Sequence, residues 1–351
     1  MIITNTIEPY KELQTTEDLY YRNKPKINAK VEILLSTYNG EKYLKEQLNS
    51  LLTQECIENI KISIRDDGST DGTCDILRSY EEKYHLNITY GTNLGVNFSM
   101  TELLKNADND FDYFAFCDQD DVWDTGKILA AVLALDGLPE EDPLLWGCME
   151  MLTDESLCAI SLMPVPKYLG NFYNAIIQNK LAGHTQVFNR ALRNILLKVP
   201  PEKMYLYDWV TYILASAFGK VLFDTNCLGL YRQHGKNVVG YELNAIAQIP
   251  RRFKRLTNGA FKQISTQMQY VYELFEDDLN TQYKNELNIF LKSRRNFIKR
   301  ILYICNTKIK RNTRFESIQF RILYLLGVFG GRRNVFSGLK KEFNKTNEII
   351  R

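Results

Sequence analysis

The sequence predicts an α/β fold with a Rossmann-like, mostly parallel central sheet flanked by helices, followed by a C-terminal helical region. Short apolar segments alternate with amphipathic segments over residues 31–135, which is typical of repeated β-loop-α units. Polar loops follow several of the apolar segments directly. From about residue 245 onward, apolar residues recur only at helical spacing. These three observations favour a sheet domain with helices appended to it.

The elements can be assigned in order along the chain. The first predicted strand, residues 31–36, precedes a loop at residues 38–40 and a helix with leucines at 44, 48, 51 and 52. The second and third strands are followed by a loop and a helix in the same way. Beyond Asp136 the pattern loosens into Pro-containing connections. The remaining predicted strands are residues 60–64, 88–90, 113–117, 187–188 and 221–223.

Composition and charge define the class of protein. The 351 residues are 45% hydrophobic and 25% charged, which is ordinary for a globular protein. The seven cysteines are scattered without a C-x-x-C pair, so neither a disulfide framework nor a zinc site is expected. The N-terminus lacks a secretory signal pattern, and the longest apolar window, residues 322–329, is too short to cross a bilayer. We therefore expect a cytoplasmic protein.

Charge is distributed unevenly along the chain. Residues 251–351 hold 22 Lys and Arg against 8 Asp and Glu, whereas residues 1–250 hold 22 against 34. Residues 1–30 are polar and without clear periodicity, so they are expected to form an extension outside the core. The expected organisation is an extension at 1–30, an α/β domain at 31–244 and a basic helical region at 245–351.

An acidic loop is the most informative feature of the chain. The apolar run that ends at Cys117 is followed by Asp118, Asp120 and Asp121 within four positions. Ligands of parallel α/β sheets bind at the carboxyl ends of the strands, so the acids are expected beside a ligand. Crowded carboxylates repel one another unless a divalent cation such as Mg2+ neutralises them. The alternative is an acidic turn that caps the next helix through Asp124 or Thr125.

Three other segments have residue types suited to chemistry. The loop at residues 66–72 places carboxylates and backbone N–H groups after a strand, although it would also serve as a tight turn. Asp208 has aromatic and apolar neighbours that would raise its pKa and suit it to proton abstraction, unless it is only a helix cap. Arg232 and His234 suit phosphate binding and metal ligation, respectively, or form a solvated basic turn.

Taken in order, these segments resemble the inverting family 2 glycosyltransferases of GT-A fold, and in particular the rhamnosyltransferase-like branch that builds bacterial surface polysaccharides. The resemblance covers residues 31 to about 240 and would make residues 31–244 a catalytic domain. The matching segments are Leu35–Gly40, Arg65–Asp71, Asn93–Val96, Asp118–Trp123, Gly183–Thr185, Asp208–Trp209 and Tyr231–Gly235.

The resemblance implies roles for individual residues. Asp208 would be the catalytic base, and Asp120 with His234 would hold Mg2+ or Mn2+. Asp67 would accept the N3–H of a uracil or thymine base. The remaining implied contacts are Thr37, Tyr38, Asn39 and Asp118 with the nucleotide, Arg232, Asn93 and Gly95 with the diphosphate side of the donor, and Gly183, His184, Thr185 and Trp209 in the acceptor and donor pocket.

The implied reaction moves a sugar from dTDP-rhamnose, or from a UDP-hexose, to a saccharide acceptor that is lipid-linked. One in-line displacement would invert the anomeric centre. A non-catalytic sugar-nucleotide-binding or membrane-binding module is the alternative from another functional class. The chain departs from the branch at Tyr207, where many members have His, and at Cys148-Met149, where they often have Ser-Asp. We therefore expect different acceptor contacts.

The basic helical region predicts a further partner. Residues 251–256 and 294–302 mix cations with large apolar residues at helical spacing, which is typical of helices that lie on an anionic membrane surface. A simply solvated basic face is the alternative. We expect peripheral attachment to the inner face of the plasma membrane. Nucleic acid is not expected as a partner, since a recognisable binding motif is missing from the sequence.

Overall fold

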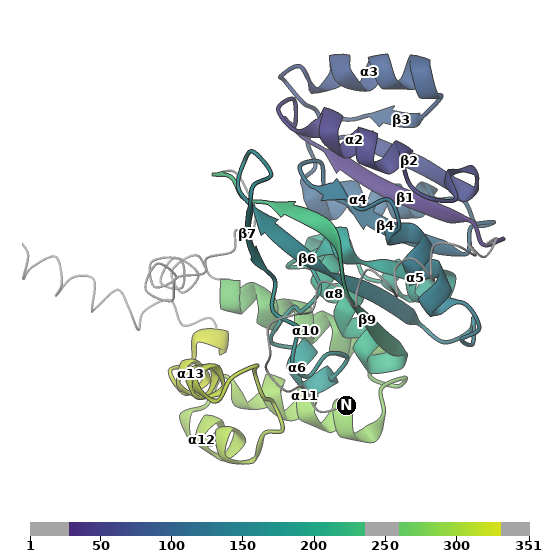
Figure 1. Cartoon of the computed structure of the whole chain (residues 1–351). Helices are drawn as coiled ribbons and strands as arrows, with labels where there is room; N and C mark the ends of the chain where they lie inside the picture. Colours follow the sequence, from purple (N-terminus) through teal and green to yellow (C-terminus); the bar gives the residue numbers. More distant parts are fainter. Residues whose placement is uncertain (1–27, 236–259, 331–351) are drawn as a thin grey trace, which may run out of the picture.

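A computed structural model describes residues 28–235 and 260–330. The described strands form one nine-stranded sheet in the order β3-β2-β1-β4-β8-β6-β9-β5, with β7 paired to β6 (Figure 1). Helices cover the sheet, and the C-terminal helices lie together at one end of the molecule (Figure 1). The α/β fold with C-terminal helices is confirmed. Most of residues 1–30 and all of 251–256 lie outside the described residues.

The first part of the sheet is parallel. Strand β1 lies between β2 and β4, and β3 extends the sheet beyond β2. All four were predicted to within about two residues, and β1 and β4 are buried along nearly their whole length, as is typical of parallel strands inside a sheet. Their bounds are β1 Val31–Thr37, β2 Ile60–Asp66, β3 Asn87–Tyr90 and β4 Tyr113–Cys117.

The second part of the sheet has mixed directions. Strand β8 (Val187–Asn189) is antiparallel to both β4 and β6, and the long strand β9 (Lys220–Arg232) runs parallel to β6 (Leu144–Thr153). Strands β5 (Val122–Trp123) and β7 (Ala159–Leu162) pair antiparallel with β9 and β6. The sequence analysis placed loose connections where β6 lies.

The helices of the α/β part connect the strands and cover the sheet. They are α2 Leu44–Leu52, α3 Thr73–Tyr84, α4 Val96–Asn106, α5 Lys127–Leu135, α6 Phe172–Ala175, α7 Arg190–Leu196 and α8 Tyr207–Phe218. Short 3-10 turns are η1 Ile57–Asn59, η2 Gly183–Thr185, η3 Pro201–Lys203 and η4 Val328–Gly330. The C-terminal helices are α10 Ala260–Phe275, α11 Thr281–Ser293, α12 Phe297–Asn306 and α13 Arg314–Leu325.

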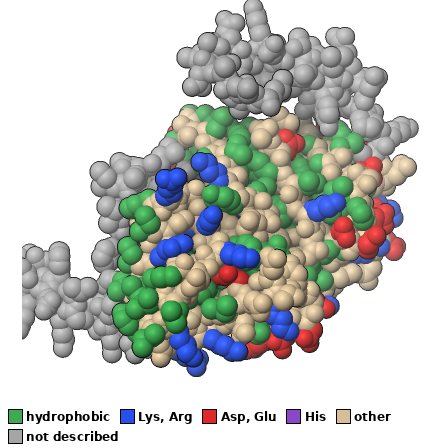
Figure 2. All heavy atoms as spheres, turned by 90° about the horizontal axis from the view of Figure 1, so that it is seen from below, with side chains coloured by type: hydrophobic (Ala, Val, Ile, Leu, Met, Phe, Trp, Pro, Cys, Tyr) green, Lys and Arg blue, Asp and Glu red, His purple; other side chains and the backbone are tan. Residues whose placement is uncertain are grey.

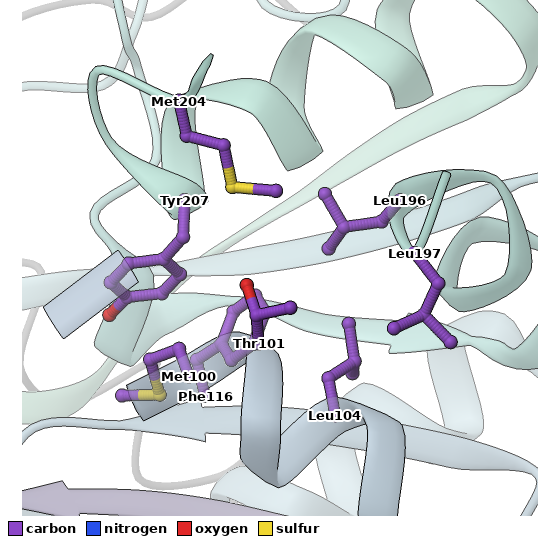
Figure 3. Close-up of a pocket in the computed structure, with 8 residues that line it drawn as sticks. All are labelled: Met100, Thr101, Leu104, Phe116, Leu196, Leu197, Met204 and Tyr207. Carbon is purple, nitrogen blue, oxygen red and sulfur yellow. The ribbon is translucent and has the colours of Figure 1, made fainter. Parts of the chain in front are cut away.

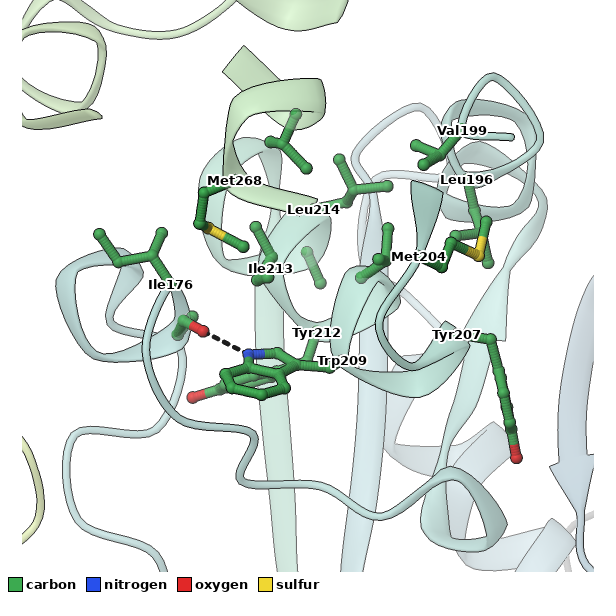
Figure 4. Packing of buried hydrophobic residues seen from close by; sticks show 14 of the residues in the cluster. Ile176, Leu196, Val199, Met204, Tyr207, Trp209, Tyr212, Ile213, Leu214 and Met268 are labelled. Carbon is green, nitrogen blue, oxygen red and sulfur yellow. Dashed lines mark hydrogen bonds between the residues drawn. The ribbon is translucent and has the colours of Figure 1, made fainter. Parts of the chain in front are cut away.

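The C-terminal helices share a hydrophobic core with the α/β part. Met268 of α10 is fully buried and lies close to Ile213 and Leu214 of α8 (Figure 4). The buried indole of Trp209, also on α8, donates a hydrogen bond to the carbonyl of Ala175 at 2.6 Å. The helices therefore pack as one body with the sheet. No helix within residues 28–235 and 260–330 is long and apolar enough to cross a bilayer.

Candidate active site

The acidic loop lies between β4 and β5, at the carboxyl end of the parallel part of the sheet. The register pairs Leu35 with Cys117, so the loop emerges next to the end of β1 and the turn that follows it. The side chain of Asp118 is 38% exposed, whereas that of Asp121 is 2% exposed. The acids therefore face both a solvent-accessible edge and a closed interior.

His184 of η2 lies against this loop. Its Nδ1 is 3.0 Å from Oδ2 of Asp118 and 3.4 Å from Oδ2 of Asp121, and its Nε2 is 2.8 Å from Oε1 of Glu150 on β6. One ligand atom each from Asp118, Asp121 and His184 fall within 4.8 Å of one another. Oδ2 of Asp121 accepts no hydrogen bond from the described part of the chain. The three side chains form a candidate metal-binding group.

The charges in this group are coupled. Burial by itself lowers the pKa of His184, but the nearby carboxylates of Asp121 and Glu150 outweigh it and raise the pKa well above its usual value. Burial raises the pKa of Asp121 well above its usual value, and His184 partly offsets that shift. These acids favour the protonated form of His184, so its Nδ1 would have to lose a proton before it could bind a metal ion. This preference was not foreseen from the sequence.

The structure also brings together Asp120 and His234, the two predicted metal ligands. Nε2 of His234 is 2.7 Å from Oδ2 of Asp120, and the imidazole lies against the ring of Tyr43 with the ring centres 4.9 Å apart. Segments 114 residues apart in the sequence thus meet at one position. The pair adjoins the candidate metal-binding group through the acidic loop.

Arg232 supports the acidic loop from behind. Its Nε donates to the carbonyl of Asp120 at 2.9 Å, and its backbone N–H donates to Oδ1 of Asp121 at 3.1 Å. The remaining guanidinium nitrogens bind the side chain of Glu46 and the carbonyl of Glu155. The guanidinium is buried and lies over the Tyr43 ring. In this arrangement Arg232 holds the loop in place, and its predicted diphosphate contact would require these bonds to change.

The loops after β1 and β2 are joined by hydrogen bonds. Thr37 Oγ1 donates to Oδ1 of Asp66 at 3.0 Å, and Oδ1 of Asn39 accepts the N–H of Thr70 at 2.8 Å. Asn39 has a φ of +50°, a left-handed conformation that Asn tolerates better than most residues. The side chain of Gln119 accepts from the N–H of Tyr38 and donates to its carbonyl, which leaves the Tyr38 side chain 45% exposed. These loops form a rigid rim beside the acidic loop.

Asp67 connects this rim to the turn before α4. It is buried beside the guanidinium of Arg65, and its two oxygens accept the N–H groups of Leu94 and Gly95 at 2.9 and 2.8 Å. Asn93 and Gly95 lie exposed in this turn, and Gly95 has a φ of +86°. The predicted base-contacting and donor-contacting residues are thus adjacent in space.

Asp208 lies in the first turn of α8. Its Oδ2 accepts a hydrogen bond from Nδ2 of Asn179 at 2.9 Å, and its Oδ1 accepts the N–H of Trp209 at 2.7 Å. Burial, with the negative charge of Asp118 as the second cause, raises the pKa of Asp208 to about 7. A carboxyl group with this pKa can exchange a proton near neutral pH.

The other predicted pocket residues are mostly buried. Gly183 and Thr185 are buried in η2, and a Cβ on Gly183 would collide with the ring of Tyr207. Trp209 points into the core, as described above. Tyr207 donates through its hydroxyl to Oδ1 of Asp118 at 3.4 Å, so its side chain reaches the acidic loop.

A small cavity lies on the other side of the Tyr207 ring (Figure 3). Its volume of about 10 Å³ leaves room for about one water molecule, far less than a sugar needs. Apolar side chains form most of its wall. The lining residues are Met100, Thr101, Leu104, Phe116, Leu196, Leu197, Met204 and Tyr207.

Sequence reasoning missed Glu150 and Asn179. Glu150 is a single acid inside the apolar segment 144–153, and a buried acid in a strand is unusual enough to have been a signal. Asn179 lies in an irregular segment without a motif, so nothing local pointed to its contact with Asp208. Asp121 was noted as part of the acidic loop without a role of its own.

The chain thus has an open α/β sheet with an acidic loop at the carboxyl end of its parallel strands, an arrangement compatible with the GT-A fold. Residues 32–143 match the family described as Glycosyl transferase family 2. The crystal structure of TarS from S. aureus has a TM-score of 0.53 at 19% identity, covering 76% of this chain and 43% of that one. The crystal structure of TarS 1–349 from S. aureus has a TM-score of 0.53 at 21% identity, covering 86% of this chain and 80% of that one. Residues 32–143 therefore belong to the family 2 glycosyltransferases, and the likeness to TarS shows the fold.

Curated relatives agree with this assignment. The dTDP-rhamnosyl transferase RfbG of Shigella flexneri is 38% identical over 103 residues, which is 28% of this chain. That match spans about a third, 35%, of the length of RfbG. An uncharacterized glycosyltransferase of Rickettsia prowazekii is 23% identical over 266 residues, 75% of this chain and 80% of the relative.

Proposed function

We propose that this chain transfers L-rhamnose from dTDP-rhamnose to a saccharide acceptor, with inversion, during synthesis of a bacterial surface polysaccharide. The similarity to RfbG, a dTDP-rhamnosyl transferase by its name, supports the donor. The proposal depends most on the position of Asp208 near the acidic loop. Burial and the negative charge of Asp118 together raise the pKa of Asp208 to about 7. A base and a donor site would thereby adjoin one another.

Asp208 is the proposed catalytic base. Its ionised form would take the proton of an acceptor hydroxyl while the oxygen attacks the anomeric carbon from the face opposite the leaving nucleotide. The hydrogen bonds from Asn179 and from the N–H of Trp209 fix the orientation of the carboxyl group. One displacement inverts the configuration of the sugar.

The nucleotide would bind along the rim formed by Thr37, Tyr38 and Asn39. Asp67 would accept the N3–H of the base, with Asp118 toward the ribose. Both oxygens of Asp67 already accept backbone N–H groups, which aim the carboxylate and leave capacity for another donor. Asn93 and Gly95 would lie on the donor side, and Gly183, His184 and Thr185 beneath the sugar.

The acid-rich loop fits a divalent cation. The buried Oδ2 of Asp121, which accepts no hydrogen bond within the described residues, has the character of a ligand atom, and carboxylate and imidazole groups suit Mn2+ and, for the oxygens, Mg2+. Asp120 with His234, or Asp118 with Asp121 and His184, would hold Mg2+ or Mn2+. When bound, the ion supplies positive charge that stabilises the departing diphosphate.

A UDP-hexose is the second candidate donor. TarS 1–349 has been solved in complex with UDP-GlcNAc, and that structure gives a TM-score of 0.50 at 20% identity, covering 85% of this chain and 82% of that one. Uracil and thymine present the same N3–H edge to Asp67. The two candidates therefore differ in the sugar rather than in the base contact.

We propose a lipid-linked saccharide as the acceptor, so that the enzyme works in the cytoplasm at the inner face of the plasma membrane. The support is the basic composition of residues 251–351. Of the two basic segments that predicted this, residues 294–302 lie within the described chain.

Release of the nucleoside diphosphate from dTDP-rhamnose, UDP-glucose and UDP-GlcNAc, each with Mg2+, Mn2+ or a chelator, tests the proposal. We expect metal-dependent release of dTDP to be fastest and the Asp208→Asn variant to bind dTDP normally while losing turnover. Anomeric coupling constants of the product, measured by NMR, would report inversion. Unchanged turnover in Asp208→Asn would refute the assignment of Asp208 as the base. Faster release of UDP from a UDP-hexose would identify that sugar nucleotide, instead of dTDP-rhamnose, as the donor.

A further inference from the structure

The C-terminal helices α12 and α13 expose apolar side chains on the faces that point away from the core. On α12, Arg300 and Tyr303 are buried, while Ile298, Ile301 and Leu302 follow one another at helical spacing on the opposite side. Phe297 and these three residues are 56%, 68%, 39% and 61% exposed, in sequence order. An ordinary surface helix presents polar residues there.

Helix α13 repeats the pattern. Phe320 and Tyr324 are buried, whereas Phe315, Ile318 and Ile322 form an exposed stripe at intervals of three and four residues. The two helices pack against each other. We call the exposed residues Phe297, Ile298, Ile301, Leu302, Phe315, Ile318 and Ile322 the α12–α13 face. Large apolar side chains exposed together on two neighbouring helices are typical of an interaction site.

Basic residues accompany the α12–α13 face. Residues 287–330 contain ten Lys and Arg and a single acid, Glu316, whose side chain caps the start of α13 and pairs with Arg311. Figure 2 shows the molecule from below, where hydrophobic and basic side chains lie intermixed across one side and most acidic ones lie toward the other. Six cations are exposed and form no ion pair with another described residue: Lys292, Arg295, Lys299, Lys308, Lys310 and Arg314.

We propose that the α12–α13 face docks into the surface of an anionic lipid bilayer. Helices that lie in a membrane interface bury large apolar side chains among the lipid chains while Lys and Arg at their flanks contact anionic headgroups. Both features occur here on neighbouring helices, whereas an acidic protein partner would match the cations but leave the exposed Phe, Ile and Leu side chains unexplained. This inference deepens the proposed function, because a lipid-linked acceptor presents its sugar at such a surface.

Flotation of the full chain with vesicles tests the proposal without donor or acceptor, so sugar transfer and docking can fail separately. The vesicles contain phosphatidylglycerol and phosphatidylcholine, or phosphatidylcholine alone. The variant Ile298→Glu with Ile322→Glu alters one residue on each helix. The matched control is Ile160→Glu with Leu162→Glu on β7, because those side chains are 49% and 50% exposed elsewhere on the molecule.

We expect the wild type and the β7 control to float with anionic vesicles at low salt, less so at high salt, and the α12–α13 variant to bind about tenfold more weakly or worse. Circular dichroism checks that the exposed substitutions leave the fold intact. Failure of the wild type to float, or equal flotation of the α12–α13 variant, would overturn the proposal. If the wild type does not bind vesicles but forms a dimer, and the α12–α13 variant is a monomer, the face would instead be an interface with a second copy of the chain.

Discussion

At the residue scale, the surroundings of a carboxyl group decide its chemistry. Asp208 and Asp118 are both partly buried aspartates near one site, and Asp208 has the negative charge of Asp118 beside it. Burial penalises the charged form, which raises the pKa of Asp208 to about 7. An acid with this property costs the protein stability when it ionises.

The first prediction concerns this cost. The folded-state pKa of Asp208 exceeds its usual value of 3.8, so the folded chain binds the proton more tightly than the unfolded chain, and stability falls as the pH rises between these values. Asp208→Asn removes this loss. Between about pH 4 and about pH 7 we expect the variant to gain stability over the wild type by at most about 1.4 kcal/mol per pH unit. Urea unfolding across that range measures it, and a constant difference would contradict it.

A second prediction concerns Glu150, which orients His184 through Nε2. Glu150→Gln keeps the size of the side chain but removes a charge that holds the imidazole and raises its pKa. Outer partners of metal-binding groups typically change affinity about 10- to 100-fold when altered, and we expect Mn2+ activation to weaken by an amount in that range. Glu202→Gln, an exposed acid in η3, serves as control. Equal activation constants in both variants would contradict the role of Glu150.

At the scale of elements, a buried carboxylate connects loops that the strands only bring near one another. Asp67 at the end of β2 binds Arg65 and the turn before α4, so one carboxylate fixes the relative position of a strand and a helix. The side chains of Asp67 and Arg65 are 4% and 8% exposed. Loss of either charge would leave the other buried without its partner.

The third prediction follows from that pair. We expect Asp67→Asn to lower the free energy of unfolding by about 3–5 kcal/mol, because the Arg65 guanidinium loses its counter-charge in a buried position. Asp75→Asn is the control, since Asp75 pairs with Arg78 on the exposed surface of α3 and should matter little. Urea denaturation measures both variants. If both variants lost only a small and similar amount of unfolding free energy, water or another acid would compensate the charge of Arg65 in place of Asp67.

Elements differ in how well the sequence predicted them. Strands β1 and β4 were predicted because each is a largely apolar run followed by a polar loop, and β2 because isoleucines alternate with polar residues before such a loop. Strand β6 was missed, since prolines before and after residues 144–153 suggested irregular connections and its pairing with β8 and β9 depends on distant segments. The antiparallel insertion of β8 next to β4 likewise has no local signature.

At the scale of the whole molecule, the C-terminal helices are part of the main core. Helix α10 buries Ile264, Met268 and Val271 in the same cluster as residues of α8, and the first turn of α8 contains the proposed base. A substitution in the buried face of α10 should therefore also alter the packing of α8. The domain boundary predicted at residue 244 lies outside the described residues.

The fourth prediction tests this shared core. Met268→Ala should lower the free energy of unfolding by about 2–5 kcal/mol, because a fully buried side chain leaves a cavity. We expect a single calorimetric transition that shifts as a whole. Leu274→Ala, at a position 41% exposed on the same helix, should have little effect. Two separate transitions, with only one shifted by Met268→Ala, would show that the helices unfold independently.

The shared role of Asp120 and His234 was implied by a resemblance to a known family. From its own patterns the sequence determined the α/β class, the parallel strands β1 to β4 and the acidic loop. These follow from local patterns, because apolar runs, polar loops and helical spacing are read over a few residues. Only the tertiary structure decided that His184 is held between Glu150 and the acidic loop, that Arg232 faces inward, and that α12 and α13 expose apolar faces. Those features depend on which distant segments pack together, and packing of distant segments has no signature within any one of them.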